Sequence, residues 1–73
     1  MSAYASIVNF LRVEYYGGKE WMPAGVVEDY VRSATGTKGS TADRRMRELC
    51  VKGVLEKRDE KGFKEYRLAV GYR

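Results

Sequence analysis

The sequence of 73 residues contains no histidine and no glutamine, and it has only one cysteine, one proline and one asparagine. The single cysteine, Cys50, cannot form a disulfide within the chain, and the absence of histidine excludes a zinc site built from cysteine and histidine. The apolar runs are far too short to span a membrane, and no basic segment followed by a long apolar stretch marks a signal peptide. We therefore expect a cytoplasmic (intracellular) protein in a reducing environment, with no membrane association.

The residues that carry chemistry are also not grouped as enzymes group them. The chain has no Cys–His pair, no glycine-rich phosphate loop and no cluster of carboxylates arranged around a metal. Glu28 and Asp29 are adjacent, so on a helix they diverge by about 100° instead of converging on one ion. The sequence therefore predicts neither catalysis nor a cofactor, and no small-molecule ligand is evident. The scarcity of heat-labile amides favours a thermophilic source, for which archaeal and viral origins stay open.

The excess of positive charge lies in the second half of the chain. Residues 1–37 carry three basic and four acidic side chains, whereas residues 38–67 carry ten basic and six acidic ones. The net charge of +4 is modest, but this distribution indicates a polyanionic partner such as a chain of phosphates. The other interpretation is a charged, solvated surface without a partner.

Apolar residues recur at helical spacing in the first half and predict two helices. The first covers residues 3–16, is capped by Ser2 and ends at Gly17-Gly18. Its expected inner face consists of Tyr4, Ile7, Val8, Leu11 and Tyr15. The second begins with Pro23 as its first residue and ends near Ala34, before Gly36 in the left-handed conformation. Its expected inner face consists of Val26, Val27, Tyr30 and Val31.

A third helix is predicted over residues 40–53, after the short polar turn of residues 35–39. Ser40 is its expected N-cap, Asp43 stands at the capping-box position, and Gly53 suits the left-handed residue after its end. The expected inner face consists of Ala42, Met46, Leu49 and Cys50, the last as a small buried hydrophobe. Because the turn is so short, the two helices that it joins must cross at a steep angle, as in a helix-turn-helix.

After Gly53 the apolar period changes from helical to extended. Residues 54–58 and 63–70 are expected to form two antiparallel strands joined by the loop 59–62, with Tyr66, Leu68 and Val70 on one half-buried face. Residues 20–22 are placed to add a third strand. The chain is therefore expected to be one α+β domain over residues 1–73, with three helices and a two- or three-stranded antiparallel sheet.

The most specific stretch is Ser40-Thr41-Ala42-Asp43-Arg44-Arg45-Met46-Arg47-Glu48-Leu49, followed by Lys52-Gly53-Val54-Leu55-Glu56-Lys57-Arg58. It resembles the recognition helix and the start of the wing in winged helix-turn-helix domains of bacterial and archaeal transcription regulators. The resemblance covers about residues 4–70, although Asp43 stands where that family often has serine. It implies sequence-specific binding of double-stranded DNA and transcription regulation. The helix 40–53 would then lie in the major groove, with the wing, residues 58–64, near the backbone or the minor groove.

This resemblance assigns roles to the polar residues of the second half. Arginine can hold O6 and N7 of guanine together, and Arg44 points most directly outward. Glu48 either accepts from cytosine or orients Arg44 or Arg45, and we favour the second role. The expected base contacts are Thr41, Arg44, Arg45 and Glu48. The expected phosphate contacts are Thr37, Lys38, Ser40, Arg47 and Lys52, and the cations of the wing are Arg58, Lys61 and Lys64.

Two other functions are compatible with the same residues. A winged helix can serve as a protein–protein interaction module, because fold alone does not determine function. RNA binding is the third interpretation. Partly exposed aromatics at Tyr15, Tyr16 and Tyr72 favour an interface, and a homodimer would stabilise so small a domain. Trp21 and Tyr30 are assigned to packing and not to base stacking.

Overall fold

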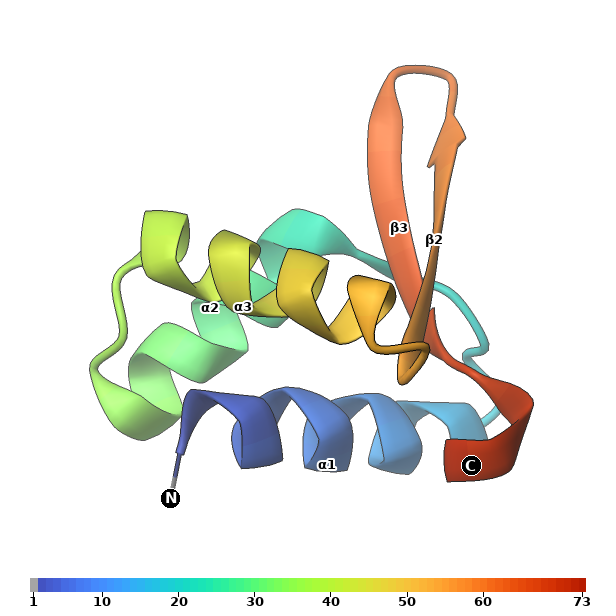
Figure 1. The fold of residues 1–73 in the computed structure, drawn as a ribbon, viewed down its shortest axis with the longest axis horizontal. Helices are drawn as coiled ribbons and strands as arrows, with labels where there is room; N and C mark the ends of the chain where they lie inside the picture. Colours follow the sequence, from blue (N-terminus) through green and yellow to red (C-terminus); the bar gives the residue numbers. More distant parts are fainter. Residues whose placement is uncertain (1) are drawn as a thin grey trace.

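Residues 2–73 are described by a computed structural model, in which three helices surround the base of a small antiparallel sheet (Figure 1). The elements in chain order are α1 (Ala3–Tyr16), β1 (Met22–Pro23), α2 (Ala24–Thr35), α3 (Gly39–Val51), β2 (Leu55–Glu60), β3 (Phe63–Leu68) and the short 3-10 helix η1 (Val70–Tyr72). This α+β order is consistent in topology with a winged helix, and the hairpin of β2 and β3 projects beyond the helices.

Helix α1 has the predicted bounds. The Ser2 hydroxyl accepts a hydrogen bond from the Ala5 N–H at 3.1 Å, and Gly17 ends the helix. Helix α2 begins one residue later than predicted, at Ala24, because Pro23 is still paired in the sheet opposite Glu65.

The inner face predicted for α2 is too wide. Val27 and Val31 are fully buried, but Val26 and Tyr30 are 44% and 40% exposed. Residues next to each other on a helix diverge by about 100°, so α2, which packs with one side on α1, α3 and the sheet, buries one narrow stripe. Tyr30 lies at the edge of that stripe, where its ring stacks on Phe10 with the centroids 4.4 Å apart.

The start of α3 differs from the prediction, whereas its end agrees. The helix begins at Gly39 after an extended Lys38, and no side chain caps it, so Ser40 lies inside the first turn and is not the N-cap. At the other end the Val54 N–H donates to the Leu49 carbonyl at 2.9 Å, and Gly53 has a φ of 78°. This is the Schellman arrangement that a glycine after the last turn predicts.

The hairpin is tighter than predicted. Lys61 and Gly62 both have positive φ, at 52° and 83°, and Glu60 pairs directly with Phe63. Two residues with positive φ form a type I′ turn, whose twist suits a hairpin, so Asp59 and Glu60 belong to β2 and not to a loop.

The sheet has the order β1-β3-β2, with Met22 paired to Tyr66 as the predicted third strand requires. Strand β3 ends at Leu68, earlier than predicted. The Ala69 N–H donates to the Val54 carbonyl at 2.9 Å, and the chain then turns into η1, which leaves Val70 74% exposed.

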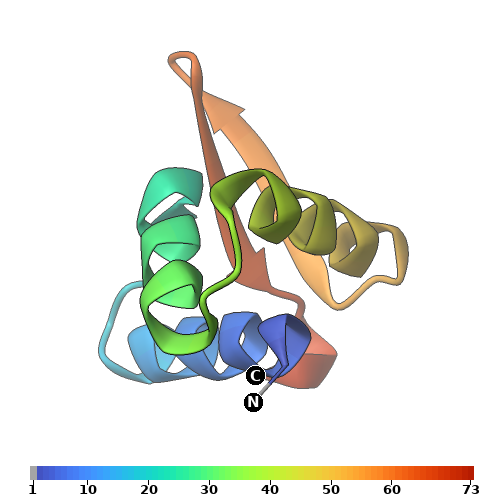
Figure 2. The same ribbon diagram turned by 90° about the vertical axis from the view of Figure 1, so that its left-hand side faces the viewer.

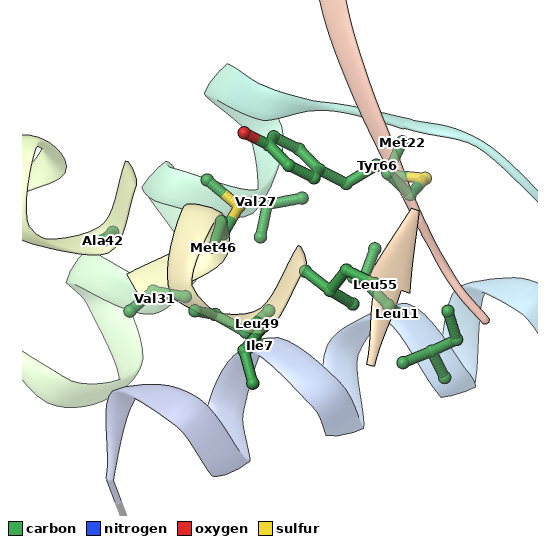
Figure 3. Packing of buried hydrophobic residues seen from close by; sticks show 11 residues of the cluster. Ile7, Leu11, Met22, Val27, Val31, Ala42, Met46, Leu49, Leu55 and Tyr66 are labelled. Atoms are coloured by element: carbon green, nitrogen blue, oxygen red, sulfur yellow. The ribbon is translucent and has the colours of Figure 1, made fainter. Parts of the chain in front are cut away.

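The hydrophobic core lies where the three helices meet the base of the sheet (Figures 2 and 3). Its buried members are Ile7, Leu11, Met22, Val27, Val31, Ala42, Met46, Leu49, Leu55, Tyr66 and Leu68. The Tyr66 hydroxyl is buried among them without a hydrogen-bond partner in residues 2–73, and burial raises the pKa of Tyr66 to about 12. Over the same residues no helix has the length and apolarity needed to cross a membrane.

Candidate nucleic-acid interface

One line of side chains on α3 faces solvent along the whole helix. It consists of Ser40, Arg44, Arg47 and Val51, which are all exposed and are spaced four, three and four residues apart. This spacing places them on a single ridge of the helix, opposite the buried Ala42, Met46 and Leu49. Arg44, the expected base contact that points most directly outward, lies on this ridge, whereas Thr41 is half-buried beside it.

The flank of α3 that faces α1 is organised by Tyr4. The Tyr4 hydroxyl donates to the Glu48 carboxylate, and the Arg45 Nη1 donates to Glu48 Oε1 at 2.9 Å. The Arg45 guanidinium carbon lies 5.4 Å and the Lys52 ammonium 5.7 Å from the centre of the Tyr4 ring. The hydrogen bond from Tyr4 lowers the pKa of Glu48, and the same bond raises the pKa of Tyr4. Arg45 and Glu48 are therefore held toward α1, and they pair with each other, as expected if Glu48 orients Arg45.

The opposite flank of α3 carries acidic groups near the start of the helix. Asp43 does not close a capping box but forms an ion pair with Arg47, at 3.2 Å between carboxylate and Nε. Oε1 of Glu28 lies so close to Gly39 that a Cβ there would be 3.3 Å away. Partial burial, and then the charges of Asp43 and Asp29, raise the pKa of Glu28. These carboxylates leave this side of the helix start unfavourable for phosphate.

The turn between α2 and α3 uses part of the predicted phosphate site internally. The hydroxyls of Thr35 and Thr37 lie 2.6 Å apart, and the Thr37 N–H donates to Thr35 Oγ1 at 3.2 Å. Lys38 and Ser40 remain exposed beside the first turn of α3, whose N–H groups have no side-chain cap. Of the predicted set at the helix start, Lys38 and Ser40 are thus better placed for a phosphate than Thr37.

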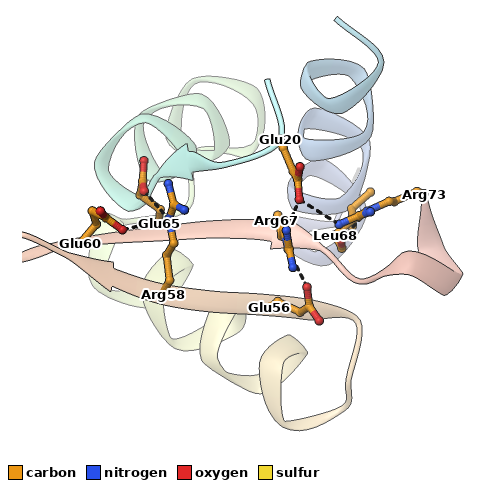
Figure 4. A network of polar contacts seen from close by, with 8 residues as sticks. All are labelled: Glu20, Glu56, Arg58, Glu60, Glu65, Arg67, Leu68 and Arg73. Atoms are coloured by element: carbon orange, nitrogen blue, oxygen red, sulfur yellow. Dashed lines mark hydrogen bonds and ion pairs between the residues drawn. The ribbon is translucent and has the colours of Figure 1, made fainter. Parts of the chain in front are cut away.

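The outer face of the sheet, the one turned away from the helices, is neutralised by its own ion pairs (Figure 4). Arg58 lies 2.8 Å from Glu65, and Arg67 lies 2.6 Å from Glu56 and also pairs with Glu20. Both guanidinium groups also lie over the Trp21 ring, at 4.4 and 4.3 Å from its centre. Arg58, one of the predicted wing cations, is therefore committed to this network, and Trp21 has the packing role assigned to it.

The inner face of the wing, the one turned toward the helices, has a different charge pattern. Lys57, Asp59 and Lys64 lie on the same face as Leu55 and Tyr66 and are exposed, and Asp59 stands opposite Lys64 in the hairpin. Lys57 acts electrostatically on Cys50 of α3, although burial dominates and raises the pKa of that thiol. Lys57 is absent from the phosphate contacts and wing cations predicted from the sequence. Its position on the α3 side of the sheet depends on the register of the hairpin, which the structure provides.

Apart from Lys19 in the loop before β1, the exposed cations without an ion pair in the described chain lie on α3, the turn before it, the residue after it and the wing. From residue 38 onward they are Lys38, Arg44, Lys52, Lys57, Lys61 and Lys64. The charge asymmetry in the sequence therefore survives as unpaired positive charge around the α3 ridge.

Comparisons with models of protein families, with curated proteins and with solved structures found no match for this chain. The observations that bear on its function are therefore its topology and the unpaired cations around α3.

Proposed function

We propose that this chain is a winged helix-turn-helix protein that binds double-stranded DNA and regulates transcription. The observation that carries the proposal is the uncovered ridge of α3, with Ser40, Arg44 and Arg47 in line. An α-helix with its side chains has about the width of the major groove of B-DNA, so such a ridge can reach base edges.

The positions of the remaining cations support the same docking. With the ridge of α3 in the major groove, Lys38 lies at one end of the helix and Lys52 at the other, next to the DNA backbone. The wing projects beyond the helices, and its turn carries Lys61 (Figure 1). Its inner cations, Lys57 and Lys64, are then available to phosphates beside the groove.

The contacts inside the protein rank the proposed base contacts. Arg44 has no ion pair in residues 2–73 and is the strongest candidate to hold a guanine. Thr41 is its partly buried neighbour. Arg45 and Glu48 reach bases only by leaving their contacts with Tyr4, so we place them second.

A second candidate function is a protein–protein interaction module, which includes a homodimer. Four exposed apolar residues favour it: Val13 and Tyr16 on α1, and Val70 and Tyr72 on η1. These two elements lie together at the C-terminal end of the chain, away from the hairpin tip (Figure 1). A sizing measurement tests the homodimer, and a dimeric regulator would favour palindromic sites with half-sites about one helical turn apart.

The experiment that tests the proposal is a titration of a labelled DNA duplex at several salt concentrations. We expect log K to fall linearly with log salt, with a slope of about −0.9 for each phosphate that is contacted. Parallel titrations with duplex RNA and with single strands test the RNA alternative. Lys19→Ala serves as the control variant, because Lys19 is exposed but lies in the loop before β1. The absence of binding at low salt would contradict DNA binding. A loss of affinity in Lys19→Ala as large as that in Arg44→Ala would contradict binding by this face.

A further inference from the structure

Val51 is the one apolar member of the α3 ridge. Its side chain is 89% exposed, the largest exposure of any bulky apolar residue in the described chain. The other large apolar side chains of α3, Met46 and Leu49, are buried. Val51 is therefore the large apolar side chain of α3 that the core leaves in solvent.

The ridge places Val51 in line with Arg44. The two residues are separated by seven positions, which corresponds to about 10 Å along the helix axis. At about 3.4 Å per base pair, a helix that follows the groove brings these two side chains to bases two or three pairs apart.

The chemistry of the groove supplies a matching group. Thymine presents a C5 methyl in the major groove, and this methyl is the apolar feature of the base edges there. Contact with it would remove the Val51 isopropyl group and the methyl from water together. A guanidinium and an isopropyl group on one ridge thus match a guanine and a thymine in one groove.

We infer that Val51 is a specificity-determining residue, which packs on the C5 methyl of a thymine two or three base pairs from the guanine held by Arg44. This inference rests on the proposed DNA-binding function and adds a base preference to it. The preferred duplex contains a guanine and a thymine at that spacing, read by one ridge of α3.

The test begins with selection of a preferred duplex from a random library. Each thymine of that duplex is then replaced singly by uracil, which removes only the C5 methyl, and each guanine by 7-deazaguanine, which removes the N7 acceptor. We expect one uracil substitution to weaken binding about fourfold, the change for one buried methyl-sized group. This thymine should lie two or three base pairs from the guanine that Arg44 contacts. That guanine is the one whose replacement by 7-deazaguanine makes wild type and Arg44→Ala bind with equal affinity.

Val51→Ala is the decisive variant, because alanine keeps the helix and removes an exposed side chain. It should bind the thymine and uracil duplexes equally, while Val26→Ala, which alters an exposed valine of α2, should keep the fourfold difference. An unchanged thymine preference in Val51→Ala, or binding in which no thymine methyl matters, overturns the role of Val51 and leaves DNA binding intact. A protein that binds no duplex at low salt overturns both.

Discussion

The hydroxyl of Tyr4 donates a hydrogen bond to the carboxylate of Glu48, which joins the first turn of α1 to the exposed half of α3. Arg45 binds the same carboxylate at 2.9 Å. Tyr4 and Glu48 are 44 positions apart in the sequence, so only the packing of α1 against α3 brings them together. Arg45 and Glu48 are thus held in contact with α1, whereas Arg44, Arg47 and Val51 lie on the exposed ridge of α3.

Replacement of Tyr4 by phenylalanine should change how stability depends on acid. The ring under Arg45 stays, but Glu48 loses the hydrogen bond that lowers its pKa. A lowered pKa in the folded state stabilises the protein above the unfolded pKa, and this stability is lost as the pH falls through the folded pKa. Wild type should therefore be more stable than Tyr4→Phe near pH 7, and in urea unfolding the two should converge as the pH falls through the lowered pKa of Glu48. Tyr16→Phe, at an exposed tyrosine, is the matched control. Parallel pH profiles for Tyr4→Phe and wild type would contradict the contact.

Replacement of Tyr66 by phenylalanine should keep or raise stability. The variant preserves the buried ring and removes a hydroxyl that has no partner in residues 2–73, so the cost of burying an unpaired polar group disappears. The folded pKa of about 12 lies above the ordinary value of 10.0, so the neutral form is favoured and stability falls as the pH rises above about 10. Thermal unfolding should show this alkaline loss diminished in Tyr66→Phe. A clear destabilisation at pH 7 would mean that the hydroxyl has a partner.

Gly53 and Gly25 should respond oppositely to alanine. Gly53 has a φ of 78°, so a Cβ strains the backbone and Gly53→Ala should lower the free energy of unfolding by about 1–2 kcal/mol. Gly25 lies inside α2 with nothing within 4 Å of an added Cβ, so Gly25→Ala should raise it by about 0.5–1 kcal/mol. Both changes add one methyl group, and urea unfolding compares them directly. The same sign for both variants would refute the assigned backbone conformations.

Arg44 and Lys57 should affect DNA binding in different ways. Arg44→Ala should relax the preference at one base pair, at a cost of about 1–3 kcal/mol there. Lys57→Ala should weaken all duplexes alike and reduce the salt slope by about one, as expected for a phosphate contact. Arg58→Ala removes a cation from the same strand that is already paired with Glu65, so its salt slope should change less than that of Lys57→Ala. Binding measurements on matched and mismatched duplexes distinguish these outcomes.

Much of the backbone could be predicted from local patterns. Ser2 and Gly17 mark the ends of α1, and Gly53 marks the end of α3. The change from helical to alternating spacing of apolar residues after Gly53 predicts the hairpin. These signals act within a few residues and so can be read directly. The prediction of Ser40 as the N-cap was wrong. The turn before α3 has Gly36 in the left-handed conformation and Lys38 in an extended one, so the helix already begins at Gly39.

The candidate site was predictable only in part. The outward position of Arg44 follows from helical spacing. Arg47, expected as a flanking phosphate contact, lies on the same ridge, and Val51 has no polar group that would mark it as a contact in the sequence. Lys57 and Arg58 are adjacent cations with opposite surroundings, and their roles depend on which face of β2 packs on the helices.

By itself the sequence determined the α+β class, the order of the elements and the concentration of positive charge after residue 37, because composition, periodicity and glycine placement are local properties. The tertiary structure decided which of those charges stay unpaired. Glu20 reaches Arg67 from the loop before β1, and Glu65 reaches Arg58 across the hairpin, so these ion pairs form only because packing brings the opposite charges together. The cations that remain, with Val51, form the surface that we propose for DNA binding.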